Sequence, residues 1–279
     1  MIMSKDPLGD RIKRQYEHRC RHYLARRSYV IIRVDGRAFH TFTRHCERPF
    51  DRELIADMNA VAVALCEQIP GAQFAFTQSD EVSVLLTDFQ SMQTEAWFDN
   101  NQSKLESLSA SLATVAFNRS RLNRLVQRHG VEAMQQREAW AAFDSRAFLV
   151  PDVNEVANVF IWRQQDATRN SIQMVAHAHF RHEELEGIGT DEMQEKLWQE
   201  RGINWNDFEV SLKRGRFIER QTVVRTVEYV EKQTGQTKVV EGVERHEWAV
   251  VDPPIFTQQR AWLMDRIPTI EPYIPRTSD

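Results

Sequence analysis

The stretch SYVIIRV at residues 28–34 decides the fold of the first half of this chain, because it is an apolar, β-branched run that stops at Asp35-Gly36. Runs of this composition that end at turn residues are typical of buried strands. We therefore predict a buried strand here, followed directly by a turn that holds Asp35 and Gly36.

The next segments predict a helix and then a hairpin. Asp51 is placed to cap a helix over 51–68, which Pro70-Gly71 would stop. Its apolar residues recur at helical spacing: Leu54, Ile55, Met58, Val61, Ala62, Leu65 and Ile69. The short runs QFAFT (73–77) and VSVLL (82–86) read as two strands, and the intervening QSDE predicts a hairpin turn between them.

A second helix over 103–128 and a strand over 141–149 complete the pattern. The order strand, helix, strand, strand, helix, strand is that of the ferredoxin-like, split βαβ fold. We therefore predict an α+β fold in which both helices pack on one face of an antiparallel sheet.

Residues 151–279 predict a mixed elaboration packed on the first domain, which we take as residues 1–150. The pattern is mainly helical over 152–182 and again over 190–201. The runs 217–230 and 237–251 predict a polar hairpin around Thr234-Gly235-Gln236, and a short helix is expected at 257–266.

The composition favours a globular protein that does not span a membrane. Apolar residues make up 42% of the 279 residues and charged residues 27%, and no apolar run approaches the roughly 20 residues that a membrane helix needs. The N-terminus lacks an apolar stretch of signal-peptide type. The three cysteines form no CxxC pair, so we expect a reduced, cytoplasmic setting.

Charge is unevenly distributed, although the net charge is −4. Residues 11–27 carry seven Lys or Arg against one Glu, and a second basic stretch holds Arg119, Arg121, Arg124 and Arg128. Either stretch could meet nucleic-acid phosphates, or each could be an ordinary solvated helix face.

The predicted strand order brings three carboxylates close together. The first strand would end beside the turn between the second and third strands, which brings Asp35 close to Asp80 and Glu81. Carboxylates that converge repel one another, and divalent cations remove that repulsion. Mg²⁺ prefers one or two carboxylates with waters and phosphate oxygens, so the pattern predicts a two-ion phosphoryl-transfer site.

The residues around Asp35 fit a phosphate-binding loop. Gly36 would allow close approach to the backbone, its carbonyl could be a metal ligand, and the amides of 36–40 could receive a triphosphate. Arg37 and Arg48 could neutralise phosphate charge. The alternative stays open here, because Asp-Gly and Ser-Asp-Glu are also ordinary turn sequences.

The same segments closely resemble the tRNA-histidine guanylyltransferase family. The resemblance rests on five motifs in matching order between about residues 10 and 180: IIRVDGRAFHTFTR (31–44), RPFD (48–51), FTQSDEVSVLL (76–86), FDSR (143–146) and WRQQDATRNSI (162–172). It implies a polymerase-like palm that extends RNA in the 3′ to 5′ direction. In this reaction a tRNA 5′-monophosphate is first activated with a nucleoside triphosphate, and the 3′-hydroxyl of an incoming nucleotide then attacks the activated end. GTP and ATP are the expected substrates.

The resemblance also implies roles for particular residues. Asp35, Gly36 and Asp80 would hold two Mg²⁺ ions, and Glu81 would complete the acidic cluster. The nucleotide contacts would be Asp35, Gly36, Arg37, Ala38, Phe39, His40, Arg48, Ser79, Asp80 and Lys104. Candidates for tRNA contact are Arg146, Arg163 and Asn170. Family members are commonly tetramers, so a homo-oligomer is expected.

One departure favours the guanylyltransferase-like branch of the family, whose members more often add templated nucleotides and repair truncated tRNA. Eukaryotic members carry His-Ile-Asn-Asn-Leu-Tyr-Asn after the WRQ motif, whereas this chain has ATRNSIQ (167–173). Two alternatives remain: another palm-type nucleotidyl cyclase, whose Gly-Gly-Asp/Glu-Glu-Phe turn QSDEV does not match, and an inactive RNA-binding protein on the same fold.

Overall fold

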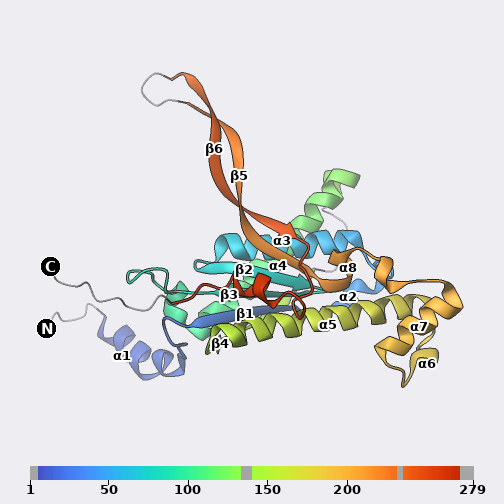
Figure 1. Cartoon of the computed structure of the whole chain (residues 1–279). Helices are drawn as coiled ribbons and strands as arrows, with labels where there is room; N and C mark the ends of the chain where they lie inside the picture. The colour runs from blue at the N-terminus through green and yellow to red at the C-terminus, as the bar shows by residue number, and fades with distance from the viewer. Residues whose placement is uncertain (1–5, 133–139, 231–234, 271–279) are drawn as a thin grey trace, which may run out of the picture.

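The computed structural model describes residues 6–132, 140–230 and 235–270, which form an α+β fold around one sheet (Figure 1). The sheet has six strands in the order β4-β1-β3-β2-β5-β6, and neighbouring strands are antiparallel throughout. Its first four strands are β1 (Tyr29–Gly36), β2 (Ala72–Gln78), β3 (Glu81–Leu86) and β4 (Phe143–Val150). The order β4-β1-β3-β2 confirms the ferredoxin-like arrangement predicted from the sequence.

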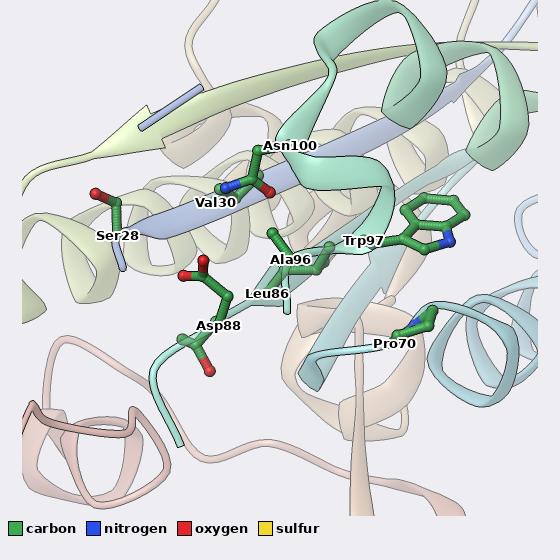
Figure 2. A pocket seen from close by; sticks show the side chains of 9 residues that line it. Ser28, Val30, Pro70, Leu86, Asp88, Ala96, Trp97 and Asn100 are labelled. Carbon is green, nitrogen blue, oxygen red and sulfur yellow. The ribbon is translucent and has the colours of Figure 1, made fainter. Parts of the chain in front are cut away.

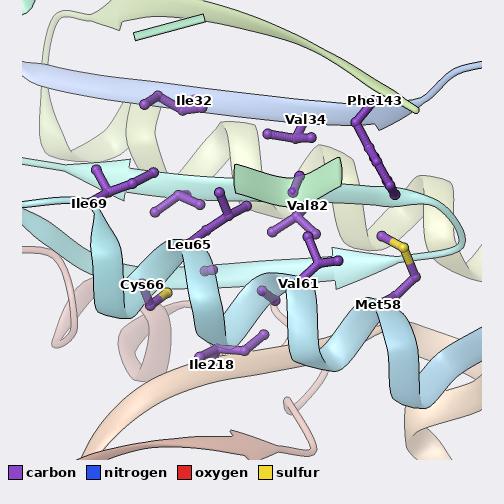
Figure 3. Packing of buried hydrophobic residues seen from close by; sticks show 14 of the residues in the cluster. Ile32, Val34, Met58, Val61, Leu65, Cys66, Ile69, Val82, Phe143 and Ile218 are labelled. Atoms are coloured by element: carbon purple, nitrogen blue, oxygen red, sulfur yellow. The ribbon is translucent and has the colours of Figure 1, made fainter. Parts of the chain in front are cut away.

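The two predicted helices cover one face of this sheet. They are α3 (Arg52–Gln68), capped by the Asp51 side chain, and α4 (Gln102–His129), whose N-cap is Asn101. Figure 3 shows α3 lying along β1, β2 and β3 with its apolar side chains between. Met58, Val61 and Leu65 of α3 are fully buried against Val82 and Val84 of β3. This packing holds the strand ends that carry Asp35 and Asp80 in a fixed relation.

Strand β1 is longer than the sequence predicted. We expected a turn at Asp35-Gly36, but both residues belong to the strand. The Cα of Asp35 lies opposite Glu81 of β3 and Asp144 of β4. A central strand has hydrogen-bonding partners on both sides, and these partners extend β1 past the point at which its apolar pattern stops.

The opposite face is covered by α5 (Val153–His179) and by the segment that leads into α9 (Arg260–Met264). Val156 and Phe160 of α5 pack with Phe256 and Leu263 against this face. Every residue of β3 is buried, as expected for a strand with layers on both sides. The predicted terminal helix at 257–266 is thus shorter in the structure, and it is held by this packing.

The second half of the chain continues the same sheet. Strand β5 (Arg216–Val230) pairs with β2 through residues 216–218 and then leaves the body as a long ribbon with β6 (Thr237–Val251), as Figure 1 shows. This confirms the predicted hairpin; part of its turn, including Thr234, lies outside the described residues. The division at residue 150 stays a prediction.

The remaining elements are short or peripheral. They are α1 (Pro7–Gln15), α2 (Phe39–Phe42), α6 (His182–Leu185), α7 (Thr190–Arg201) and α8 (Val210–Arg214), with 3₁₀ turns at Glu17–Cys20, Thr43–His45, Trp97–Asn100 and Trp205–Asp207. Within the described ranges, none of the helices is both long enough and apolar enough to cross a membrane.

Replacing Asp51 with alanine tests the cap of α3. The Asp51 carboxylate accepts hydrogen bonds from the amides of Glu53 (2.9 Å), Leu54 (2.8 Å) and Glu47 (3.0 Å). We expect Asp51→Ala to lower the free energy of unfolding by about 1 kcal/mol at pH 7, as measured by urea denaturation.

The same comparison has a predicted pH dependence. Burial raises the pKa of Asp51, but the three amide donors outweigh burial and hold this pKa below its ordinary value of 3.8. A lowered pKa in the folded state stabilises the fold above pH 3.8, and this contribution disappears as pH falls through the folded-state pKa. The difference between wild type and Asp51→Ala should therefore shrink in acid. A difference that grows in acid would contradict this assignment.

Candidate active site

Asp35 and Asp80 lie side by side at one end of the sheet. Asp80 sits in the two-residue turn between β2 and β3, and its carbonyl accepts the Gly36 amide at 3.1 Å. Asp35 is the neighbour of Gly36 on β1 and lies opposite Glu81, the residue after Asp80. The structure therefore brings together the two loops that the sequence predicted would meet.

The surroundings of Asp35 and Asp80 raise the pKa of both carboxylates. Burial raises the pKa of Asp35, and the nearby charge of Asp144 adds to the effect. Burial likewise raises the pKa of Asp80; the Ser79 hydroxyl, 2.9 Å from Oδ1, opposes this, and the charge of Asp35 raises the pKa further. In the described part of the chain, no salt bridge joins either carboxylate to a cationic side chain. Both groups are thus carboxylates that a cation would stabilise.

Glu81 does not join these two residues in a common cluster, which corrects the expectation of three converging carboxylates. Its side chain is buried and pairs with the Arg163 guanidinium of α5, with Nη1 and Oε2 separated by 2.6 Å. Burial raises the pKa of Glu81, and the charge of Arg163 partly offsets that rise. The catalytic role of Glu81 stays a prediction, whereas its structural role in joining β3 to α5 is evident.

The residues present fit a magnesium site with few protein ligands. Among the described residues, no group of three or more His, Cys, Asp or Glu side chains could hold a metal ion. A cation here would have Asp35, Asp80 and the Gly36 carbonyl available and would complete its shell with water and phosphate oxygens. That mixture is what Mg²⁺ prefers, because it dehydrates reluctantly.

Fewer backbone amides in the loop after β1 can bind phosphate than the sequence suggested. The amides of Gly36 and Arg37 already donate to the carbonyls of Asp80 and Ala142. A Cβ built on Gly36 would lie 2.2 Å from the Phe39 ring, so the missing side chain makes room for Phe39 rather than for a ligand. Phe39 is itself buried against Phe42, Phe117 and Phe143, so only its backbone could meet a nucleotide.

The amides of Ala38, Phe39 and His40 remain suitable for phosphate. They begin α2, where a helix has no intrahelical acceptor for its first amides. Ala38 adopts the left-handed conformation, with φ of 54°, and the side chains of Arg37 and His40 are exposed beside it. Arg48 is also exposed, three residues before the cap of α3.

Lys104 is not brought to this end of the sheet. It lies in the first turn of α4, where the neighbouring Gln102 donates to the Ala147 carbonyl. Thr114 of the same helix contacts the Phe143 amide, opposite Gly36. The ten residues between Lys104 and Thr114 correspond to about 15 Å of helix. The predicted triphosphate contact at Lys104 is therefore remote from Asp35 and Asp80 within one chain.

A pocket of about 60 Å³ opens beside the turn that carries Asp80. Gln78 and Ser79 of the hairpin line it, together with residues from the start of α3, from α5 and from α8. Asn170 lines it as well, and its side-chain nitrogen lies 3.4 Å from the Gln78 side-chain oxygen. The predicted tRNA contact Asn170 is thus part of this pocket, which we call the hairpin pocket.

The other two tRNA candidates differ in exposure. Arg146 is exposed on β4, with its Cα opposite Arg33 of β1. Arg163 is buried, and its pairing with Glu81 and Asp166 argues against a direct contact with RNA. Its neighbour Trp162 begins the WRQQD motif and is not among the site residues predicted from the sequence. Trp162 is 49% exposed, and Arg33 lies 5.4 Å from its ring centroid.

A second cavity lies at the opposite end of β1, lined by Ser28, Asp88 and Asn100 among others (Figure 2). Its volume is about 10 Å³, close to the minimum for one water molecule. Asp88 is already engaged there by Arg26 Nε at 2.6 Å and by the Arg27 amide at 2.7 Å. This cavity is too small for a nucleotide.

A larger groove of about 460 Å³ lies between α3 and α4, but neither Asp35 nor Asp80, nor a residue next to either of them, lines it. The hairpin pocket is the better candidate because Ser79, the neighbour of Asp80, lines it.

Comparison with known proteins identifies the family of the chain. A family profile described as tRNAHis guanylyltransferase matches residues 10–151, which is just over half of the chain and includes both Asp35 and Asp80. The tRNA(His) guanylyltransferase of Debaryomyces hansenii is 26% identical over 267 residues, covering 87% of this chain and 94% of its own length.

Two solved structures of bacterial proteins are similar over nearly the whole chain. A bacterial tRNA(His) guanylyltransferase-like protein in complex with ATP has a TM-score of 0.78 and 37% identity, covering 94% of this chain and 99% of its own. One in complex with GTP has a TM-score of 0.71 and 39% identity, covering 92% and 97%. With its two carboxylates placed on this fold, the chain belongs to the tRNAHis guanylyltransferase family.

Proposed function

We propose that this protein is a magnesium-dependent nucleotidyltransferase that adds GMP or other nucleotides to the 5′ end of tRNA in the 3′ to 5′ direction. One observation carries the proposal: Asp35 and Asp80, 45 residues apart in the sequence, meet at one sheet end without a cationic partner in the described structure. Family membership supplies the reaction class. The ATRNSIQ segment at 167–173, which resembles the guanylyltransferase-like branch, favours templated repair of 5′ ends as well as single guanosine addition.

Different residues would bind the phosphates and the base of the nucleotide. Asp35, Asp80 and the Gly36 carbonyl would hold Mg²⁺, which would neutralise the attacking and leaving oxygens during transfer. The amides of residues 38–40, with Arg37 and Arg48, would bind phosphate oxygens. The hairpin pocket adjoins Asp80 through Ser79, so a nucleotide whose phosphates lie at the carboxylates can place its base there.

ATP and GTP are the proposed nucleotide substrates. The two bacterial relatives were solved with ATP and with GTP, and their similarity extends over more than nine-tenths of this chain. We propose that one nucleotide activates the 5′-monophosphate and that the 3′-hydroxyl of the next attacks it. The strand order β4-β1-β3-β2 supports a palm-like catalytic domain within residues 1–150, on which the rest of the chain packs.

A transfer assay tests this function directly. The protein is supplied with Mg²⁺, labelled GTP or ATP, and a 5′-monophosphorylated tRNA that lacks its first nucleotide. We expect label at the tRNA 5′ end. A cyclic dinucleotide would instead indicate a palm-type cyclase, and tRNA binding without either product would indicate an inactive RNA-binding protein.

The surface that meets tRNA is proposed to include α1 and Arg146. Arg11, Lys13 and Arg14 are exposed on α1. The basic stretch on α4 is less available than its sequence suggested, because Arg124 and Arg128 pair with Asp57 and Glu53 of α3. The N-terminal stretch is therefore the stronger candidate for phosphate contact.

Salt should weaken tRNA binding steeply. Each phosphate contact releases counterions, so the logarithm of the binding constant should fall linearly with the logarithm of salt concentration. Replacing Arg11, Lys13 and Arg14 with alanine should reduce that slope by about 0.7 to 0.9 for each phosphate that is no longer neutralised, as measured by filter binding across a salt series. A slope that is flat in the wild type, or equal in both proteins, would rule out this surface.

We also propose that the protein acts as a homo-oligomer, and a tetramer is the state expected from the family resemblance. Light scattering after size-exclusion chromatography measures this state. A monomeric mass at micromolar concentration would contradict the proposal.

A further inference from the structure

Arg216 is a buried arginine with an unused donor at the hairpin pocket. It begins β5 opposite Thr77 of β2, is only 4% exposed, and lines the pocket. Its Nε donates to Asn59 Oδ1 at 2.8 Å, and Nη1 lies 3.4 Å from the Ser211 carbonyl oxygen. Nη2 is buried and has no hydrogen-bond acceptor in the part of the chain that the structure describes.

The backbone around Arg216 holds it in this place. Gly215 has a φ of +76°, and a Cβ there would lie 2.5 Å from the Phe76 ring and 2.8 Å from the Thr77 carbonyl oxygen. Only glycine allows β5 to start this close to β2. The start of β5 is therefore set against the strand that leads to Ser79 and Asp80.

The buried guanidinium also lacks a direct counterion among the described residues, in addition to the missing acceptor at Nη2. Burial lowers the pKa of Arg216 to about 10, so the side chain remains charged at neutral pH. Within the described residues, no carboxylate forms a salt bridge with it; Asp252 acts on it only through its charge at longer range. A buried donor without an acceptor is unfavourable, and a ligand in the pocket that presents one would be bound in preference.

The purine bases differ in what they offer such a donor. Guanine presents two acceptors on its Hoogsteen edge, O6 and N7, and arginine is their commonest partner in specific recognition. Adenine presents N7 beside an amino group, which is a donor and would face the guanidinium unfavourably. A guanidinium N–H that meets the base edge in the hairpin pocket therefore distinguishes the two bases at position 6. Arg216 lines the pocket, and because Nη2 has almost no accessible surface, this contact requires the guanidinium to turn toward the base.

We propose that Arg216 reads the base of the incoming nucleoside triphosphate and favours guanine by donating to O6. The inference rests on the proposed function, because that function places the base in the hairpin pocket. It adds the residue that selects the base and the atom that is selected. No residue of the sequence motifs predicted this role, since Arg216 precedes the run 217–230 that marked the strand.

Two nucleotide analogues test the selected atom in the unaltered protein. Inosine triphosphate retains O6 and lacks the 2-amino group, whereas purine riboside triphosphate lacks both. Isothermal titration with Mg²⁺ present should show wild-type protein binding inosine triphosphate at least about tenfold more tightly, the range expected for a hydrogen bond to a charged donor. Equal affinities for the two analogues would overturn the proposal, whatever the variants show.

Variants then assign the preference to Arg216. In Arg216→Met, the affinity ratio of the two analogues should fall to about one, with the loss confined to inosine triphosphate and GTP. Arg216→Leu also removes every donor and tests the same ratio if the methionine variant does not fold. Arg266→Met is the matched control, because Arg266 pairs with Glu219 on the same strand and does not line the pocket.

The possible outcomes distinguish a failure of the Arg216 role from a failure of the proposed nucleotidyltransferase function. A ratio that is preserved in both Arg216 variants overturns the role of Arg216, even where tRNA labelling proceeds normally. Wild-type protein that binds neither GTP nor ATP overturns the proposed function, and the inference with it. A ratio lost equally in Arg266→Met would show a general structural effect and would also overturn the assignment.

Discussion

Asp80→Ala is expected to reduce nucleotide transfer to tRNA by at least about a hundredfold while the fold remains intact. Removing a group that merely supports a metal ligand typically costs about 10- to 100-fold, so the loss of a ligand itself should cost at least the upper end of that range. The turn does not depend on this side chain, because the Asp80 backbone carbonyl makes the contact with Gly36. Single-turnover labelling of the tRNA 5′ end measures the rate, and circular dichroism checks the fold.

Asp144→Ala is the matched control for this experiment. Asp144 lies opposite Asp35 on the neighbouring strand, so it is also a carboxylate at this end of the sheet. It is more than half exposed, however, and lies 3.6 Å from Arg146, an exposed pair of little energetic consequence. We expect transfer within a few-fold of wild type. Near-normal turnover by Asp80→Ala, or an equal loss in both variants, would remove the metal assignment.

Breaking the ion pair between Glu81 and Arg163 is expected to destabilise the fold by about 3–5 kcal/mol when Arg163 is replaced, and by less when Glu81 is replaced. Both side chains are less than 10% exposed, so replacing Arg163 leaves the Glu81 carboxylate buried without its counterion. Replacing Glu81 removes the shorter ion pair of Arg163 and leaves it with Asp166 at 3.4 Å. Urea denaturation of Glu81→Leu and of Arg163→Met at neutral pH measures this cost.

The double variant Glu81→Leu/Arg163→Met should be more stable than either single variant. Replacing both members of a buried pair with apolar side chains removes two desolvation costs together and is often nearly neutral. If the two costs simply add, the side chains are not coupled and the pairing is not what holds β3 to α5. Transfer activity of the double variant also shows whether Glu81 is needed for catalysis, since stability no longer masks its role.

Local patterns predicted most of the strands and helices. The apolar spacing over 51–68 and the cap at Asp51 are properties of neighbouring residues, and α3 follows them closely. The hairpin around Ser79-Asp80 was predictable for the same reason, because the two short strand runs and the turn residues between them all lie within residues 73–86. The end of β1 was mispredicted because two partner strands, and not its own composition, extend it through Gly36.

The site was only partly predictable. That Asp35 meets Asp80 followed from the strand order, since β1 and β3 are neighbours in this topology. The motif could not predict that Glu81 forms an ion pair with Arg163. Arg163 lies 82 residues away on α5, and packing sets how this helix is rotated over the sheet. Phe39 shows the same limit: its position in the motif suggests a ligand contact, but its ring is part of the core.

The sequence by itself determined the order of strands and helices, the family and the two carboxylates at the sheet end. These features depend on turn residues, apolar spacing and motifs, which are properties of residues close together in the chain. Only the tertiary structure decided which charges are already neutralised and which buried donors are left without an acceptor, namely Arg163 Nε and Arg216 Nη2 among the described residues. Ion pairing and burial depend on side chains brought together from distant parts of the chain. Glu81 with Arg163, and Arg216 at the hairpin pocket, are the two places where that difference alters the chemistry.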